Sequence, residues 1–249
     1  MSGRVSIVGL GPGDEDLVTP QVRAVLAEAT DVVGYFPYVA RVAERDGLTL
    51  HGSDNRVEID RSQHALQMAA EGKNVVVVSS GDPGVFAMAA AVFEALEAGP
   101  AAWLNLRIDV LPGITAMLAA SARAGAPLGH DFCAINLSDN LKPWDLIEKR
   151  LRLAAEADFA MAFYNPRSKS RPEGFEKTLE ILKDACGDDR PVIFARNVSR
   201  DDETLKVVPL SQTTADMADM RTMVLVGSST TRIIKRDQGD IIYTPRSVS

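Results

Sequence analysis

Three glycine-containing segments each follow a short hydrophobic run, and they carry residue types that could hold a ligand. They are residues 9–14 (GLGPGD), residues 79–84 (SSGDPG) and residues 112–116 (PGITA). Glycine lets a backbone approach a ligand closely, Asp82 offers a carboxylate, and Thr115 stands where a helix is expected to begin. Because the carboxyl ends of parallel strands meet at one edge of a sheet, we expect these segments to form one binding site.

The first segment departs from the glycine fingerprint of dinucleotide-binding proteins. That fingerprint needs glycine at the position of Asp14, and Pro12 makes the turn stiffer than a usual phosphate-binding loop. A nicotinamide-dependent oxidoreductase stays open as an alternative of another class, which a failure to bind NAD would exclude. A tight turn without any ligand is the plainest reading of this segment taken alone.

The composition limits the kinds of partner. The chain has 249 residues and a formal net charge of −7, which argues against general binding to nucleic acid. Its hydrophobic runs are shorter than the roughly 18–20 residues that cross a bilayer, and its first residues do not resemble a signal peptide. We therefore expect no nucleic acid, no membrane and a cytoplasmic location.

Histidines and cysteines are few, and they are not spaced as metal ligands. His51, His64 and His130 lie apart from one another, and Cys133 and Cys186 form no CxxC pattern. We expect neither a metal site nor a disulfide.

Short β-branched runs alternate with helical segments, which is typical of parallel sheets covered by helices. The chain is therefore expected to be an α/β protein. In the first half, Thr19 is expected to cap a helix that starts at Pro20. The other expected elements there are strands at residues 5–8, 31–33, 75–78 and 108–111, and helices at 62–71, 85–98 and 113–125.

A connector at residues 126–129 (APLG) marks the expected domain boundary. It divides the chain into an N-terminal α/β domain, residues 1–124, and a C-terminal α/β domain, residues 125–249. The elements expected in the second domain are strands at 132–137, 158–164, 192–195, 205–208 and 223–226, helices at 143–157, 174–185 and 211–218, and a hairpin at 233–243.

The order and spacing of these segments resemble the tetrapyrrole methylases, which include uroporphyrinogen-III and precorrin methyltransferases. The matching parts span nearly the whole chain: residues 8–14, 81–83, 112–116 and 164–166 (YNP), and the late strand that ends at Gly227. The resemblance implies two small α/β domains with S-adenosylmethionine in the cleft between them, and S-adenosylhomocysteine as the product. It also implies a homodimer.

A narrower resemblance is to the C17-methyltransferases of cobalamin (vitamin B12) biosynthesis. It rests on residues 131–139 (DFCAINLSD), the pair Pro143-Trp144 and residues 164–171 (YNPRSKSR); Asn136 departs from the serine of that pattern. The implied reaction methylates C17 of precorrin-3B and contracts the macrocycle to precorrin-4. The cobalt-factor III enzyme of the anaerobic pathway stays open as an alternative.

The resemblance also implies which residues hold the cofactor. The matching positions are Pro12, Ser80, Gly81, Asp82, Val85, Thr115, Ala116, Asn165, Val198 and Thr222.

The tetrapyrrole substrate carries acetate and propionate groups, so basic residues are expected to bind it. Arg167, Lys169 and Arg171 form the densest basic run, with a solvated loop as the alternative. For Arg56 and Arg61 we expect a solvated surface.

Ring contraction should need proton movement at an oxygen. His130 is the first catalytic candidate, because histidine titrates near neutral pH, and Asp139 is the second. Helix capping is the alternative for Asp139.

Two further functions remain to be excluded. An RNA ribose methyltransferase is disfavoured by the acidic charge. A tetrapyrrole carrier without activity would be excluded by a single-turnover methyl-transfer assay.

Overall fold

The computed structural model describes residues 3–54 and 57–247, and the chain divides into two compact units. Unit 1 ends at Thr115 and unit 2 begins at Ala116. The boundary lies earlier than expected, because helix α5 (Ala116–Ala124) packs against the strands of unit 2. Arg56 lies outside the described residues.

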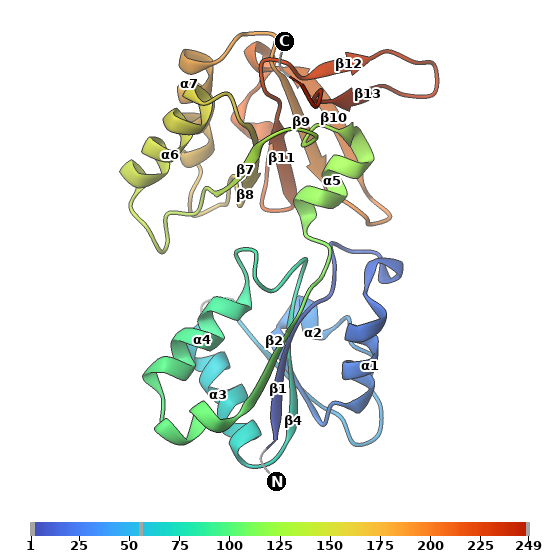
Figure 1. Cartoon of the computed structure of the whole chain (residues 1–249), viewed down its shortest axis with the longest axis vertical. Helices are drawn as coiled ribbons and strands as arrows, with labels where there is room; N and C mark the ends of the chain where they lie inside the picture. The colour runs from blue at the N-terminus through green and yellow to red at the C-terminus, as the bar shows by residue number, and fades with distance from the viewer. Residues whose placement is uncertain (1–2, 55–56, 248–249) are drawn as a thin grey trace. The chain divides into compact units, whose positions relative to one another are not determined.

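Unit 1 contains a five-stranded sheet in the order β3-β2-β4-β1-β5, in which every neighbouring pair is parallel (Figure 1). The strands are β1 Arg4–Gly9, β2 Asp31–Tyr35, β3 Thr49–Ser53, β4 Asn74–Ser79 and β5 Arg107–Leu111. Four of them were predicted. Strand β3 was missed because its sequence, TLHGS, contains no hydrophobic run, as an edge strand allows.

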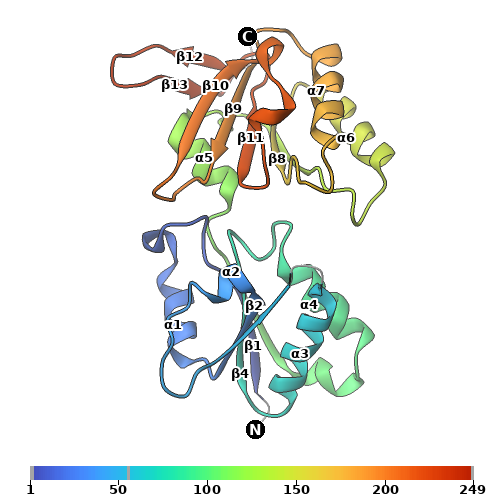
Figure 2. The same cartoon turned by 180° about the vertical axis from the view of Figure 1, so that it is seen from behind.

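Helices cover both faces of this sheet (Figures 1 and 2). On one face, Val22 of α1 packs with Val8 and Val76. On the other face, Ala65 of α3 and Val92 of α4 pack with strand residues that alternate with those of the first face, such as Ile7 and Val77. The helical segments are α1 Pro20–Glu28, α2 Phe36–Val39, α3 Glu58–Ala70 and α4 Met88–Ala98, with 3-10 turns at Glu15–Leu17 and Ala101–Asn105.

The predicted start of α1 is confirmed, since the Thr19 hydroxyl accepts a hydrogen bond from Val22 N at 3.3 Å. Helix α3 begins four residues before the predicted residue 62, with the acids Glu58 and Asp60 in its first turn. Helix α4 begins three residues after the predicted residue 85. The delay arises because Phe86 has φ 52°, which no right-handed helix contains.

Unit 2 contains a mixed sheet in the order β10-β9-β11-β8-β7. Only β7 and β8 pair in parallel; the other neighbours are antiparallel, so the expectation of a parallel sheet is wrong here. The strands are β7 Phe132–Asn136, β8 Ala160–Tyr164, β9 Pro191–Arg196, β10 Thr204–Pro209 and β11 Thr222–Val226.

One face of this sheet packs on α6 (Trp144–Glu156) and α7 (Gly174–Ala185), both close to their predicted ranges. Ile147 and Phe175 lie in the core between these layers. A small second sheet contains β6 (Gly125–Ala126) and the predicted terminal hairpin, β12 (Arg232–Ile234) and β13 (Ile241–Tyr243).

The predicted helix at 211–218 is wrong. Two 3-10 turns, Leu210–Gln212 and Ala215–Met217, take its place. Between them the Thr213 hydroxyl donates to Leu210 O at 2.7 Å, a local bond that competes with helical hydrogen bonding.

No helix in the described ranges is long and apolar enough to span a membrane.

Candidate functional site

In unit 1, the connections after β1 and β4 leave on opposite faces of the sheet. These strands are neighbours, and the chain passes from β1 to α1 on one face and from β4 to α4 on the other. Open α/β sheets bind ligands outside the carboxyl ends of strands at such a switch point. This edge is therefore the candidate site of unit 1.

The loops at this edge meet backbone to backbone. Gly11 N donates to Gly81 O at 3.2 Å and Gly81 N donates to Gly11 O at 2.8 Å, with φ 68° and 63° respectively. A Cβ added to Gly9 or to Gly113 would stand 2.2 Å from Gly81 O. No side chain fits at Gly9 or Gly113, and the positive φ of Gly11 and Gly81 would strain any other residue, so backbone groups form the lining.

Asp82 ties two of these loops together. Its Oδ1 accepts a hydrogen bond from Gly84 N at 2.8 Å, and its Oδ2 accepts one from Gly113 N at 3.0 Å. Both carboxylate oxygens thus already serve the backbone. Within unit 1, Asp82 acts first as a positioning residue that joins the loop after β4 to the loop after β5.

The other cofactor residues predicted in unit 1 lie in the same loops. Pro12 is buried after β1, the Ser80 hydroxyl donates to Gly11 O at 3.4 Å, and Thr115 is buried after β5. Val85 lies in the turn before α4. The structure therefore brings these predicted positions to one edge of the sheet.

Unit 2 also gathers its predicted residues at one edge. Strands β7, β8 and β9 run in the same direction, because β11 is antiparallel to both β8 and β9. Asn165 follows β8, Val198 follows β9, and Thr222 opens β11 at that edge. Ala116 is tied to the same region, since Met117 N donates to the Tyr164 hydroxyl at 3.3 Å.

The Asn165 amide has a fixed orientation. Ser138 N donates to Asn136 Oδ1 at 3.0 Å, and because a backbone N–H can only donate, the oxygen of Asn136 is identified. The atom of Asn165 that lies 3.1 Å from that oxygen must then be its Nδ2. Asn165 Oδ1 is thereby turned away from Asn136 and can accept a hydrogen bond from a ligand.

Val198 and Thr222 can contact a ligand through their backbone groups more readily than through their side chains. Val198 is buried between Asn197 and Ser199, which have φ 51° and 64°. The Thr222 hydroxyl donates to Asp219 Oδ1 at 2.8 Å and accepts from Asp219 N at 3.1 Å.

The predicted basic run does not act as one group. Arg171 turns inward, and its Nη1 lies 3.4 Å from Asn165 O and 3.5 Å from Leu137 O. Arg167 instead donates to Pro172 O at 3.3 Å, and Lys169 is exposed. Only Arg171 reaches the edge formed by β7 and β8.

Arg61 is not solvated, contrary to expectation. It is 4% exposed, and its Nε donates to the Ser53 hydroxyl at 2.8 Å. Burial lowers the pKa of its guanidinium. Arg61 is therefore a buried structural residue of unit 1.

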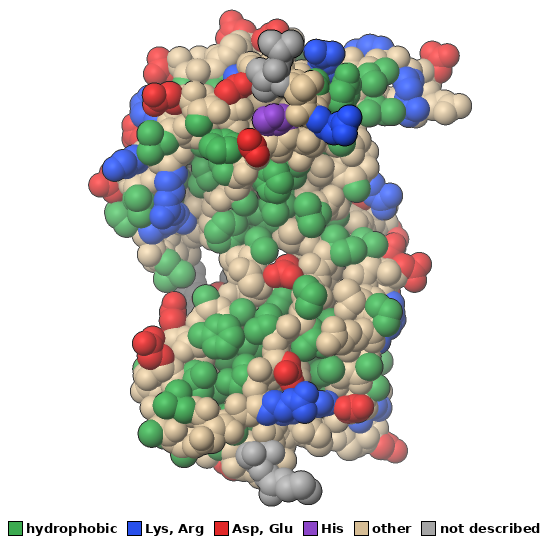
Figure 3. All heavy atoms as spheres, viewed as in Figure 1, with side chains coloured by type: hydrophobic (Ala, Val, Ile, Leu, Met, Phe, Trp, Pro, Cys, Tyr) green, Lys and Arg blue, Asp and Glu red, His purple; other side chains and the backbone are tan. Residues whose placement is uncertain are grey.

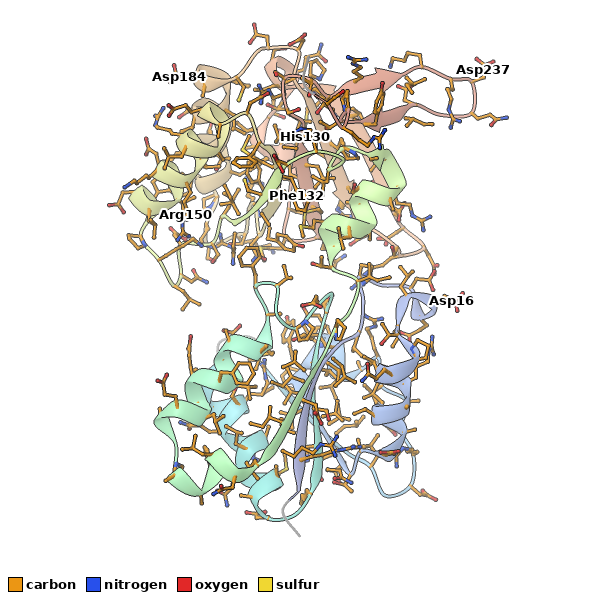
Figure 4. The ribbon with its side chains drawn as sticks, viewed as in Figure 1. Asp16, His130, Phe132, Arg150, Asp184 and Asp237 are labelled. Atoms are coloured by element: carbon orange, nitrogen blue, oxygen red, sulfur yellow. The ribbon has the colours of Figure 1, made fainter. Side chains whose placement is uncertain are left out.

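His130 and Asp139 lie at opposite ends of β7. His130 precedes the strand, next to Asp131, and Figure 4 labels it with Phe132 at the strand's start. Asp139 follows the strand, with its Oδ1 4.0 Å from Arg171 Nε. A five-residue strand is about 16 Å long, so the two side chains cannot serve one reaction at one edge. Of the two, only Asp139 lies at the edge that holds Asn165.

Across the described part of the chain, no three His, Cys, Asp or Glu side chains are grouped so that they could hold a metal ion. Cys133 and Cys186 are free, and burial raises the pKa of both thiols.

Comparison with known proteins gives consistent matches. Residues 4–214 match the model of the Tetrapyrrole (Corrin/Porphyrin) Methylases. A precorrin-3B C(17)-methyltransferase from Sinorhizobium sp is 53% identical over 247 residues, which cover 99% of this chain and 97% of that protein.

Solved structures agree in fold. A crystal structure of the methyltransferase CobJ has 65% identity and a TM-score of 0.94, covering 98% of this chain and 100% of that one. A uroporphyrin-III C-methyltransferase from Thermus thermophilus, solved with S-adenosylhomocysteine, has 22% identity and a TM-score of 0.68. The match covers 90% of this chain and 97% of that one, and it concerns the fold alone.

Proposed function

Because this chain belongs to the tetrapyrrole (corrin/porphyrin) methylases, we propose that it methylates C17 of precorrin-3B in cobalamin biosynthesis. The methyl group comes from S-adenosylmethionine, and the macrocycle contracts to give precorrin-4. The near full-length similarity to a protein of that activity supports this substrate over others of the family.

The observation that carries the proposal is the glycine contact at the carboxyl edge of unit 1. A Cβ at Gly9 or Gly113 would stand 2.2 Å from Gly81 O, so the backbones of three loops lie against one another without side chains between them. An adenosyl group needs a few directed hydrogen bonds and an apolar slot. The cofactor supplies the electrophilic methyl group; the protein has to hold and orient both reactants rather than provide a strong acid.

In this proposal two sets of residues are candidates for cofactor contacts, one in each unit. The first set lies in the loops of unit 1, from Pro12 to Thr115, with Asp82 holding those loops in place. The second set lies at the edge of unit 2, where Asn165 Oδ1 accepts a hydrogen bond from the cofactor. Ala116, Val198 and Thr222 add backbone contacts. Arg171 serves the substrate, while Arg167 and Lys169 are proposed only as outer contacts of its carboxylates.

The decisive experiment is a product analysis with labelled S-adenosylmethionine. Precorrin-3B should gain one methyl group and contract, whereas cobalt-factor III should react much more slowly. Mass spectrometry that finds no methylated tetrapyrrole from either substrate would refute the proposal. Preferential reaction with cobalt-factor III would show that the protein acts in the anaerobic pathway.

The same assay tests the acid or base of ring contraction. Since His130 lies at the far end of β7 from Asn165, His130→Ala should give contracted product at the normal rate. An accumulated methylated but uncontracted intermediate would restore His130 to the mechanism.

The family resemblance further supports a homodimer that works in the cytoplasm. Sedimentation velocity at micromolar protein concentration tests the first property, and cell fractionation tests the second.

A further inference from the structure

Two cations bind the backbone directly after β7 in unit 2. Lys142 Nζ donates to Ser138 O at 2.9 Å, and Arg171 Nη1 approaches Leu137 O at 3.5 Å. The two carbonyl groups belong to consecutive residues. Lys142 and Arg171 therefore bind the same short segment at the edge that carries Asn165, although 29 residues separate them in the sequence (171 − 142 = 29).

A third cation, Arg150, belongs to α6, the helix that begins two residues after Lys142. It is an exposed residue of α6, where Figure 4 labels it, and Figure 3 shows Lys and Arg side chains gathered over that helix. Burial lowers the pKa of the Lys142 ammonium, and Arg150 and Arg171 lower it further, with Asp139 offsetting part of the effect. Arg150 thus adds to the positive charge that acts on Lys142.

The negative charge within this group is small. Asp139 Oδ1 lies 4.0 Å from Arg171 Nε, at the outer limit of an ion pair. Among residues 3–54 and 57–247, no carboxylate lies within 4.0 Å of the charged atoms of Lys142 or Arg150. In a chain of net charge −7, three cations with one distant carboxylate form a local excess of positive charge.

A local excess of positive charge attracts anions, and a guanidinium group binds a carboxylate through two parallel hydrogen bonds. We propose that Lys142, Arg150 and Arg171 form a binding site for the side-chain carboxylates of the tetrapyrrole substrate. The inference rests on the proposed function for the identity of the ligand. It assigns to Lys142 and Arg150 the role that the sequence pattern gave to Arg167 and Lys169.

The test uses charge-removing variants that keep the local contacts. Lys142→Gln retains a donor for Ser138 O, and Arg150→Gln alters a side chain without a hydrogen bond among the described residues. Lys149→Gln is the matched control, since Lys149 is the exposed neighbour of Arg150 on α6. Arg171 is left intact because it also holds the backbone of the site.

Binding is measured with uroporphyrin, a stable octacarboxylate, through its fluorescence, and S-adenosylhomocysteine binding is measured by calorimetry. Lys142→Gln and Arg150→Gln should each weaken uroporphyrin about tenfold and reduce its salt dependence, whereas Lys149→Gln should change little. Cofactor affinity should stay within about twofold in all three variants.

Asp139→Asn supplies a test of opposite sign. Removal of the one nearby carboxylate should tighten uroporphyrin binding several-fold, which loss of local structure would not do. Equal affinities in Lys142→Gln, Arg150→Gln and Lys149→Gln would overturn the inference, even if the wild type methylates precorrin-3B. Weakened uroporphyrin binding in a protein that methylates no tetrapyrrole would leave this site standing and refute only the proposed function.

Discussion

At the scale of single residues, the polar side chains of both candidate edges act largely through other groups. Asp82 uses both carboxylate oxygens on backbone N–H groups, and Asn136 uses its amide oxygen to orient Asn165. Side chains of this kind set geometry. Their removal should therefore weaken ligand binding while the folded state persists.

Asn136→Ala should raise the dissociation constant of S-adenosylhomocysteine by about three- to tenfold. This corresponds to the loss of one ordinary hydrogen bond that orders Asn165, about 0.5–1.5 kcal/mol. Asn136→Asp retains an acceptor for both Ser138 N and Asn165 Nδ2, and calorimetry should find its affinity close to wild type. Asn140→Ala is the control, as an exposed asparagine of the following loop. An unchanged affinity in Asn136→Ala would show that Asn136 has no role in binding S-adenosylhomocysteine.

The sequence singles out Asn136 only because it departs from the serine of the family pattern. Its function depends on the neighbouring strand β8, which brings Asn165 within 3.1 Å across the sheet. Lys142 and Arg150 were missed for a similar reason. They are separated along the chain, whereas a basic run such as that of residues 167–171 is visible in one dimension. Arg167 and Lys169 were predicted to bind the substrate because they belong to such a contiguous run.

At the scale of elements, the glycine contact between three loops fixes the shape of the cofactor edge. Gly113→Ala should lower the affinity for S-adenosylhomocysteine at least tenfold, because its Cβ would stand 2.2 Å from Gly81 O and force the loops apart. The free energy of unfolding should fall by about 1–3 kcal/mol through overpacking.

Gly187→Ala is the matched control. Its nearest neighbour is the tip of the Asp189 side chain at 3.2 Å, which can move, so affinity and stability should stay close to wild type. Wild-type affinity in Gly113→Ala, measured by calorimetry, would show that the loops tolerate separation.

The opposite, amino-terminal ends of the unit 1 strands are joined by Asp31. Its Oδ1 lies 2.8 Å from His51 Nε2 on β3 and 3.1 Å from Lys73 Nζ before β4. Burial alone would raise the pKa of Asp31, but hydrogen bonds from His51, Thr30 and Lys73 outweigh it and hold the pKa below its usual value.

A carboxylate with a depressed pKa in the folded state stabilises the protein above its unfolded pKa of about 3.9, and this contribution is lost as the pH falls further. Asp31→Asn should therefore reduce the free energy of unfolding at pH 7 by about 1–3 kcal/mol. The difference from wild type should shrink below about pH 4. Urea titrations at both pH values measure it, and a difference independent of pH would contradict the ionic role of Asp31.

Hydrophobic runs and capping residues correctly predicted most of the strands and helices. They did not predict where some helices begin or in which direction the strands of unit 2 run. The turn at Phe86 and the bonds of Thr213 are local events that periodicity does not record. Strand direction in unit 2 depends on which partners pair, so alternation of elements alone wrongly favoured a parallel sheet.

At the scale of the whole molecule, ligand binding should appear as a change in stability. S-adenosylhomocysteine at about one hundred times its dissociation constant should add about 2.7 kcal/mol to the free energy of unfolding, provided that it binds only the folded protein. NAD at the same concentration should add nothing. Thermal unfolding measures both, and a stabilisation by NAD alone would favour an oxidoreductase.

The family and the α/β class were accessible from the sequence, because the glycine segments and the YNP motif keep their order along the chain. The division after residue 115 could not be predicted from the sequence. Helix α5 directly follows the glycine segment at residues 112–116, yet it packs against strands of unit 2. Packing partners distant in sequence decide such boundaries.

The position of β1 affects how unit 1 can fold during synthesis. This strand lies between β4 and β5, so both of its neighbours, at residues 74–79 and 107–111, are synthesised after it. At about 5–20 residues per second, several seconds pass before both are available. Until then the hydrophobic edge of β1 is open to other nascent chains. Chaperone dependence should therefore be greatest for chains arrested before residue 107, and it should fall once β5 has emerged.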